Sequence, residues 1–284
     1  MPYFKVGKEN SGNIELYYED HGSGKPIVLI HGWPLSGRSW EKQTSFLLNA
    51  GYRVILYDRR GFGDSSYPTT GYDYDTFAHD LHRLITKLDL HEATLVGFSM
   101  GTGEVARYLG SYGSKQVEKA VFISSIPPFL SKANDNPNGM DPSVFDEIMN
   151  AISEDRLAYL TKFLSNFYNF DLLKGNRVSA EVVQESWNIA ADASPKGTRD
   201  CVATWGTDFR KDLSRIDIPT LIIHGTADRI LPFALTGPRL HEALPNSRFL
   251  AVDDGPHGLI WTHAEVVNRE LLDFLKEEKM KKAA

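Results

Sequence analysis

The sequence has a single cysteine, Cys201, among its 284 residues. One thiol cannot form a disulfide within the chain, and it cannot provide the several thiolates that structural zinc or iron–sulfur sites use. The sequence also lacks an apolar run long enough to span a membrane, and its first residues lack the apolar segment of a secretory signal. These absences predict a cytoplasmic protein of a reducing compartment with no membrane partner.

The sequence also has no excess of positive charge. Lys and Arg number 31 against 37 Asp and Glu, which gives a net charge of −6. A chain of this charge is not expected to be held on nucleic acid or anionic lipid by a general electrostatic field. With 42% hydrophobic and 11% aromatic residues, the chain has enough apolar material for a large core. We therefore expect a folded protein whose partners are small molecules.

Short continuous apolar runs recur between stretches of helical periodicity. Continuous runs, in contrast to alternating ones, are typical of strands buried on both faces of a parallel sheet. Two stretches that precede them, separated by a glycine-containing loop, predict an antiparallel hairpin leading into the sheet. The pattern predicts an α/β fold with about eight strands, mostly parallel, and helices on both faces. The expected strands cover residues 3–6, 14–19, 26–30, 52–57, 93–98, 120–124, 220–223 and 248–252.

The alternation of strand and helix stops in the segment 126–212. This segment has no strand pattern, and helical patterns cover residues 141–152, 154–173, 179–191 and 196–205. We therefore predict a core domain of residues 1–125 and 213–284 with a helical cap insert of residues 126–212. Within the core, a helix is expected at 76–88, and the polar residues placed largely on its solvent face are His79, Asp80, His82 and Arg83.

The stretch Gly97-Phe98-Ser99-Met100-Gly101 matches the pattern G-x-S-x-G. It follows the expected strand 93–98 and precedes a helical pattern. In that context a serine sits on a sharp strand-to-helix turn, with its hydroxyl exposed above the sheet. The alternative is that this stretch only forms a tight turn and has no catalytic role. The strand, the helix and the two partner residues described next favour a nucleophile.

A serine nucleophile needs a base, and the base needs an acid that orients it. Asp228 follows the strand 220–223 and His257 follows the strand 248–252, so both are expected in the crevice at the carboxyl ends of the strands. The order Ser99, Asp228, His257 is the nucleophile, acid, base order of this type of site. Asp253 and Asp254 are alternative acids, but they lie so close to His257 along the chain that shaping the turn is the simpler role for them.

Acyl transfer also needs two donors for the developing oxyanion. We expect one of them to be the backbone N–H of Met100, the residue after the nucleophile. The other is expected from the loop after the strand 26–30, where the N–H of Trp33 is the candidate because Pro34 has none. His31, in the same loop, is expected to brace it and not to react.

Large apolar residues of the insert, and of the loop after strand 220–223, are candidates for a substrate pocket. Most aromatic residues of the insert are expected to pack its own core. A few are expected to face a pocket between the cap and the sheet. The candidates are Phe129, Phe145, Phe163, Trp205 and Leu231.

These residues and motifs resemble the α/β-hydrolase superfamily. Within it they resemble the bacterial cofactor-free haloperoxidases, also called non-heme chloroperoxidases or perhydrolases, with their esterase and γ-lactamase relatives. The resemblance runs nearly end to end, and its motifs are Leu29-Ile30-His31-Gly32-Trp33-Pro34-Leu35, Tyr57-Asp58-Arg59-Arg60-Gly61-Phe62-Gly63, Gly71-Tyr72-Asp73-Tyr74-Asp75, Gly97-Phe98-Ser99-Met100-Gly101 and Gly255-Pro256-His257-Gly258.

The resemblance implies a Ser99–His257–Asp228 triad, oxyanion donors at Trp33 and Met100, no metal, heme or other cofactor, and a possible homo-oligomer. Haloalkane dehalogenases and epoxide hydrolases carry an aspartate at the position of Ser99, so their chemistry is not expected here. One departure from the family pattern is Thr102, where many relatives have a further glycine.

Together, the residues and the resemblance predict a serine hydrolase that cleaves small carboxylic esters through an acyl-enzyme, with water or hydrogen peroxide as the acyl acceptor. One alternative is the opening of small cyclic amides, as in γ-lactamases, because the same triad serves both reactions. Another is a non-catalytic ligand receptor on the same fold, or a scaffold protein. An intact triad disfavours both, since neither needs those three residues.

Overall fold

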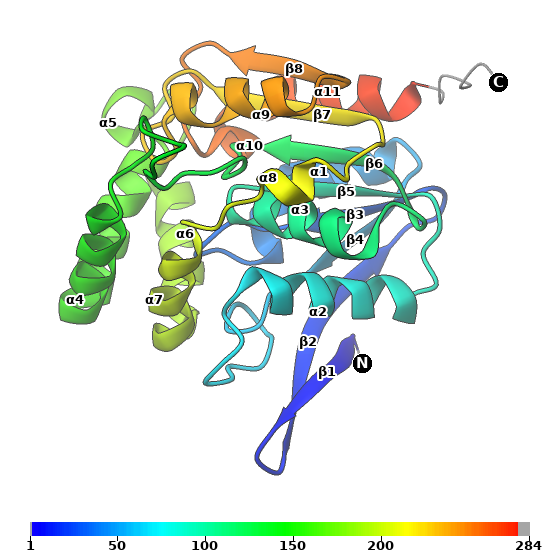
Figure 1. Cartoon of the computed structure of the whole chain (residues 1–284), viewed down its shortest axis with the longest axis horizontal. Coiled ribbons are helices and arrows are strands. Elements are labelled where there is room, and N and C mark those ends of the chain that lie inside the picture. The colour runs from blue at the N-terminus through cyan, green and yellow to red at the C-terminus, as the bar shows by residue number, and fades with distance from the viewer. Residues whose placement is uncertain (1, 278–284) are drawn as a thin grey trace.

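The computed structural model describes residues 2–277, and its centre is one sheet (Figure 1). Within these residues the sheet has eight strands in the order β1-β2-β4-β3-β5-β6-β7-β8. β1 pairs antiparallel with β2, as the sequence predicts, β2 pairs antiparallel with β4, and the other pairs are parallel. The strands are β1 (Tyr3–Glu9), β2 (Gly12–His21), β3 (Pro26–Ile30), β4 (Arg53–Tyr57), β5 (Ala93–Phe98), β6 (Val117–Ile123), β7 (Thr220–Gly225) and β8 (Ser247–Val252).

Helices cover both faces of the sheet, and for this reason every residue of β5, β6 and β7 is buried. On one face lie α1 (Glu41–Asn49), α10 (Leu259–Thr262) and α11 (Ala264–Lys276). On the other face α2 (Tyr74–Lys87), α3 (Met100–Tyr112) and α8 (Arg210–Leu213) pack together, and α9 (Gly237–Ala243) lies against β7 and β8. Two short 3₁₀ helices, η1 (Gly37–Trp40) and η2 (Phe233–Leu235), precede α1 and α9.

The solvent face predicted for α2 is wrong at one position. Asp80 is only 1% exposed, and its two carboxylate oxygens accept hydrogen bonds from Arg60 at 2.7 and 2.8 Å. Arg60 reaches the helix from the loop after β4, and a buried carboxylate is tolerated when a guanidinium pairs both of its oxygens. His79 and Arg83 are exposed as expected, whereas His82 is half-buried.

The segment between β6 and β7 contains helices and, among the described residues, isolated bridges in place of strands. Figure 1 shows α4–α7 gathered beside the carboxyl ends of the parallel strands. The two helices predicted at 141–152 and 154–173 are the two parts of α4, which are separated by a kink at the non-helical residue Asp155. This helix ends early because Asn169, which follows it, is left-handed with φ of 46°. The helices are α4 (Ser143–Phe167), α5 (Phe170–Leu173), α6 (Ala180–Asp192) and α7 (Pro195–Thr204).

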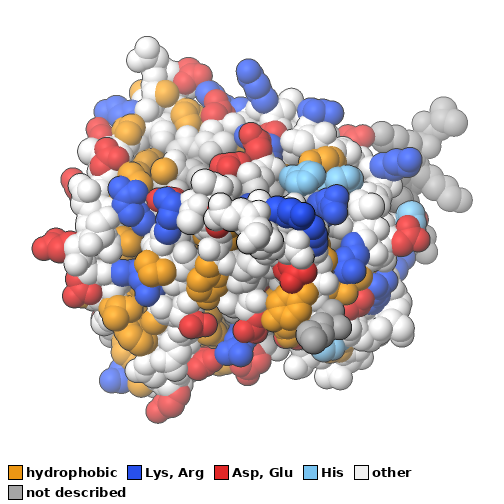
Figure 2. All heavy atoms as spheres, turned by 90° about the horizontal axis from the view of Figure 1, so that it is seen from below, with side chains coloured by type: hydrophobic (Ala, Val, Ile, Leu, Met, Phe, Trp, Pro, Cys, Tyr) orange, Lys and Arg blue, Asp and Glu red, His pale blue; other side chains and the backbone are white. Residues whose placement is uncertain are grey.

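The surface of the described chain carries mixed charge. On the face in Figure 2, Lys and Arg side chains are interspersed with Asp and Glu. Exposed apolar side chains of the scattered kind seen there are ordinary on protein surfaces. No helix within residues 2–277 has the length and apolar character needed to cross a membrane.

A fully buried ion pair joins the ends of three elements of the core. Nε and Nη2 of Arg59, which follows β4, lie 3.0 and 2.9 Å from Oε2 of Glu104 on α3. Nη2 also donates to the carbonyl of His31, after β3, at 3.0 Å. The two charged side chains are 1% and 0% exposed. Removal of one partner would therefore leave an uncompensated charge in the core.

We expect Glu104→Leu to lower the free energy of unfolding by about 3–5 kcal/mol. The double variant Arg59→Met/Glu104→Leu should lose much less than the sum of the two single changes. Denaturant unfolding followed by tryptophan fluorescence measures these values. Asp200→Asn, which removes the partner of Lys196 from a surface ion pair of 2.7 Å, is the control and should cost less than about 1 kcal/mol. Equal losses for Glu104→Leu and Asp200→Asn would contradict the prediction.

Candidate active site

Ser99 forms the turn between β5 and α3. Its backbone angles, φ 52° and ψ −121°, are strained for a residue that carries a side chain. The turn needs glycine at position 101, because a Cβ there would collide with the backbone carbonyl of Ile30 on the neighbouring strand β3. This geometry projects the Ser99 hydroxyl above the carboxyl end of the sheet.

The structure brings Ser99, His257 and Asp228 into one hydrogen-bonded chain. Nε2 of His257 lies 2.8 Å from Oγ of Ser99, and Nδ1 of the same ring lies 2.7 Å from Oδ2 of Asp228. Asp228 follows β7 and His257 follows β8, which are adjacent parallel strands. All three residues are buried. In such a chain the imidazole can accept the serine proton while the carboxylate holds the ring in place.

Both oxygens of the Asp228 carboxylate have partners. Oδ1 accepts hydrogen bonds from the backbone N–H groups of Ile230 and Leu231, each at 2.8 Å. Oδ2 faces two histidines, His257 and, at 3.2 Å, Nε2 of His224. Burial by itself would raise the pKa of Asp228, but the proximity of His257 and the hydrogen bonds from both histidines hold this pKa well below its ordinary value. Asp228 is therefore ionised, as the acid that orients a histidine must be.

The other acidic residues near His257 do not complete an alternative site. Asp253 and Asp254 are exposed in the turn after β8, and no hydrogen bond joins either of them to His257. The backbone N–H of Asp254 donates to Oγ1 of Thr226 at 3.0 Å, a contact that holds the turn. In the part of the chain that the structure describes, no group of three or more His, Cys, Asp and Glu side chains is placed to hold a metal ion.

His224 is a residue of this site that the sequence analysis missed. Its Nδ1 accepts a hydrogen bond from the backbone N–H of Ser125 at 3.2 Å, which leaves Nε2 as the protonated nitrogen; it lies 3.2 Å from both Oδ2 of Asp228 and the carbonyl oxygen of Leu231. The ring is completely buried. Its sequence position does indicate a place in the site. His224 lies at the carboxyl end of β7, and Asp228 and His257 are likewise predicted from their positions after strand ends.

Both predicted oxyanion donors are free to act. Within residues 2–277, the backbone N–H groups of Trp33 and Met100 have no hydrogen-bond acceptor. His31 holds the loop that carries Trp33: its Nε2 accepts from the N–H of Arg59 at 3.0 Å, and its Nδ1 donates to the carbonyl of Gly32 at 2.8 Å. Burial, and then the charge of Arg59, holds the pKa of His31 well below its ordinary value. His31 is therefore neutral with both nitrogens engaged, which suits a bracing role.

Thr102, the departure from the family pattern, ties the turn to the pocket. Its hydroxyl donates to the carbonyl of Ser99 at 2.5 Å and accepts from the backbone N–H of Ile126 at 3.0 Å. Ile126 lines the cavity above Ser99. A glycine at this position could form neither side-chain bond, so Thr102 adds a direct link between the strained turn and the pocket wall.

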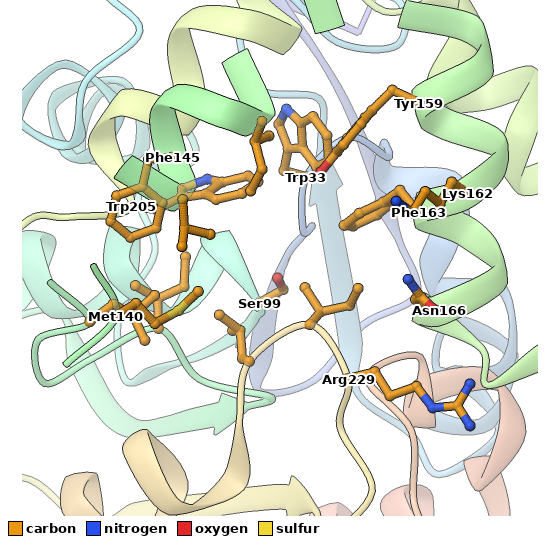
Figure 3. A pocket seen from close by; sticks show the side chains of 16 residues that line it. Trp33, Ser99, Met140, Phe145, Tyr159, Lys162, Phe163, Asn166, Trp205 and Arg229 are labelled. Atoms are coloured by element: carbon orange, nitrogen blue, oxygen red, sulfur yellow. The ribbon is translucent and has the colours of Figure 1, made fainter. Parts of the chain in front are cut away.

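A cavity of about 280 Å³ lies above Ser99, and Figure 3 shows the serine hydroxyl pointing into it. One wall is aromatic. The ring of Trp33 lies edge-on to the ring of Trp205, with centroids 5.1 Å apart, and to the ring of Phe163, at 4.9 Å. This wall gives an apolar part of a small substrate a place to bind beside the serine.

The expected pocket residues are placed in the cavity lining with one exception. Phe129 does not line the cavity, and the guanidinium of Arg210 lies over its ring at 5.0 Å from the centroid. Residues on one face of α4 also line the cavity. They could not be predicted from the sequence, because only the position of the helix shows that this face is turned to the cavity. The expected residues found in the lining are Phe145, Phe163, Trp205 and Leu231, and the unpredicted ones on α4 include Tyr159, Lys162 and Asn166.

Comparison with known proteins assigns the family. A family model described as the alpha/beta hydrolase fold matches residues 25–264. A Synechocystis sp. protein, provisionally named a non-heme chloroperoxidase, is 63% identical over 97% of this chain and 100% of its own length. The bifunctional esterase/perhydrolase DCH of Acinetobacter calcoaceticus is 35% identical over 93% of this chain and 96% of its own.

A solved structure agrees with this assignment. The crystal structure of bromoperoxidase from Bacillus anthracis matches with a TM-score of 0.93 and 52% identity, over 97% of this chain and 99% of that one. The match extends from the sheet through the helices between β6 and β7, since almost the whole of both chains is covered. The chain therefore belongs to the α/β-hydrolase family and, within it, to the group that contains the non-heme haloperoxidases and esterase/perhydrolases.

Proposed function

We propose that this protein is a serine hydrolase that cleaves small carboxylic esters through an acyl-enzyme on Ser99, and that hydrogen peroxide can replace water as the acyl acceptor. The observation that carries the proposal is the continuous hydrogen-bonded chain from Ser99 through His257 to Asp228. It lies at the base of a cavity with an apolar wall, beside two backbone donors that have no acceptor in the described part of the chain.

In the first half of the reaction, Oγ of Ser99 attacks the ester carbonyl while Nε2 of His257 accepts the serine proton. The negative charge that develops on the carbonyl oxygen is stabilised by the N–H groups of Trp33 and Met100. The protonated His257, stabilised by Asp228, then gives its proton to the departing alcohol oxygen as the bond between that oxygen and the acyl carbon breaks. The product is an ester between the acyl group and Ser99.

In the second half, a water molecule loses a proton to His257 and attacks the acyl carbon, which releases a carboxylic acid and returns the proton to Ser99. Hydrogen peroxide can follow the same path, and the product is then a peracid. In solution the peracid oxidises a halide ion to hypohalous acid and is itself reduced to the carboxylic acid. The names of the haloperoxidase and esterase/perhydrolase relatives support this branch.

A covalent label tests the proposal directly. A fluorophosphonate should modify Ser99, as shown by mass spectrometry of the labelled peptide, and it should abolish two activities together. These are p-nitrophenyl acetate hydrolysis, and bromination of monochlorodimedone in the presence of acetate and peroxide. Modification at another residue, with both activities retained, would rule out Ser99 as the nucleophile. If the protein opens a lactam but does not hydrolyse the esters, its substrate is a cyclic amide and not an ester.

A further inference from the structure

The cavity above Ser99 also has polar side chains in its lining, beside the residues of its apolar wall. Tyr159, Lys162 and Asn166 line it from α4, together with Phe163, at a spacing that places all four on one face of the helix. In Figure 3 the side chains of Lys162 and Asn166 extend from the helix toward the space in front of Ser99. The cavity therefore has hydrogen-bond donors and a positive charge next to its aromatic residues.

The charge of Lys162 is not neutralised by the protein. Among the described residues, its ammonium group has no hydrogen-bond or ion-pair partner, and the side-chain amide of Asn166 has none either. The positions three and four residues away on α4 are Ala158, Tyr159, Ser165 and Asn166, so the helix offers no carboxylate at the distance of a side-chain ion pair. Two donors that face the cavity are thus available to a ligand.

No acid competes with a ligand inside the cavity. Its lining contains two cations, Lys162 and Arg229, and neither Asp nor Glu. Arg229 is engaged elsewhere, since Nη1 donates to Asp171 at 2.6 Å, and Figure 3 shows its guanidinium directed away from Ser99. Lys162 is solvent-exposed, so the attraction it offers to a carboxylate is modest and weakened by salt.

We infer that Lys162 and Asn166 form a carboxylate subsite, and that the preferred substrates are esters that carry a second, ionised carboxyl group, such as half-esters of dicarboxylic acids. The inference rests on the proposed esterase function and specifies its substrate class. The apolar half of such an ester occupies the wall of Trp33, Phe163 and Trp205, the scissile carbonyl lies at Ser99, and the free carboxylate lies between Lys162 and Asn166. The ammonium and the amide then each donate a hydrogen bond to the carboxylate.

Two pairs of esters, each differing only in a terminal methyl or carboxylate group, test the subsite. Mono-p-nitrophenyl adipate and p-nitrophenyl hexanoate vary the acyl half. 3-Acetoxypropanoate and propyl acetate vary the alcohol half, with turnover followed in a pH-stat. The measured quantity is the ratio of kcat/KM for the anionic ester to kcat/KM for the neutral ester, corrected for uncatalysed hydrolysis. Comparison of the two pairs also shows which half of the ester carries the recognised carboxylate.

Lys162→Gln should lower this ratio about 3–10-fold for at least one pair, mainly through a higher KM for the anionic ester, and Lys162→Glu should lower it further. Lys162→Arg, which keeps the charge, should retain most of the ratio. Added salt should reduce the ratio of the wild-type protein and leave that of Lys162→Gln nearly constant. Lys8→Glu, which makes the same change of charge on the exposed hairpin of β1 and β2, should leave the ratio unchanged.

An unchanged ratio in both Lys162→Gln and Lys162→Glu, for both pairs, would overturn the subsite while leaving the proposed esterase intact. Failure of the proposed function has a different outcome, because neither the neutral nor the anionic esters would then be hydrolysed. In that case, titration calorimetry with monoethyl adipate still tests the subsite. Weaker binding to Lys162→Glu than to Lys8→Glu supports the subsite, and equal or absent binding to both overturns it.

Discussion

Replacement of Ser99 by alanine should lower kcat for p-nitrophenyl acetate hydrolysis by at least about 10⁴-fold, because the change removes the atom that attacks the carbonyl. Bromination of monochlorodimedone with acetate and peroxide should fall to the same extent, since both reactions pass through one acyl-enzyme. The fold should be retained. The Ser99 side chain makes no hydrogen bond within the described chain besides that to His257, so its loss disturbs little packing.

The control for this variant is Ser214→Ala, which removes an exposed hydroxyl bonded to the carbonyl of Lys211 on α8. Both activities should be unchanged in the control. A fall in ester hydrolysis with undiminished bromination would show that peroxide chemistry takes place by another route. Full ester hydrolysis in the Ser99→Ala variant would exclude the acyl-enzyme altogether.

The sheet and the positions of Ser99, Asp228 and His257 could be predicted because each follows from a short sequence pattern that specifies one backbone conformation. Continuous apolar runs predict strands buried on both faces, and helices do cover both faces here. The ends of parallel strands meet at one edge, so residues more than a hundred positions apart are brought together. The distances between their side chains then follow from the pairing of β7 with β8 and of β5 with β6.

Features that depend on packing between distant elements could not be predicted in the same way. Asp80 is a polar residue on a helix, so the sequence predicts it on the solvent face, but Arg60 from another loop is buried against it. Phe129 looks like a pocket residue by type, yet Arg210 covers it. The sequence does not predict that Lys162 lines the cavity, because exposed lysines are common on protein surfaces. Only the position of α4 places this side chain at the cavity.

The buried pair of Arg59 and Glu104 joins two parts of the proposed active site. Glu104 lies on α3, which begins directly after Ser99, and Arg59 bonds the carbonyl and the imidazole of His31 in the loop proposed to supply an oxyanion donor. One rigid unit therefore holds both the nucleophile turn and the loop that carries Trp33. A site preorganised in this way keeps its two backbone donors fixed while charge develops on the substrate.

The second large effect is expected for Asp228→Asn, which preserves the size of the side chain and removes its charge. The N–H groups of Ile230 and Leu231 both need an acceptor at the position of Oδ1, so the introduced amide oxygen should take that place. The amide nitrogen is then directed at Nδ1 of His257 and toward Nε2 of His224, which is already a donor. Two donors would face each other at His224, and the amide would force Nδ1 of His257 to become an acceptor.

With Nδ1 as an acceptor, the neutral ring of His257 carries its proton on Nε2, the nitrogen that must accept the proton of Ser99. We therefore expect kcat to fall about 10⁴-fold with little change in KM, the size of effect that the corresponding change has in a serine protease triad. Steady-state kinetics on p-nitrophenyl acetate measure this loss. Asp253→Asn and Asp254→Asn make the same chemical change at exposed positions near His257 and should retain activity. A large loss in either of them, with activity kept in Asp228→Asn, would move the role of the acid from the end of β7 to the turn after β8.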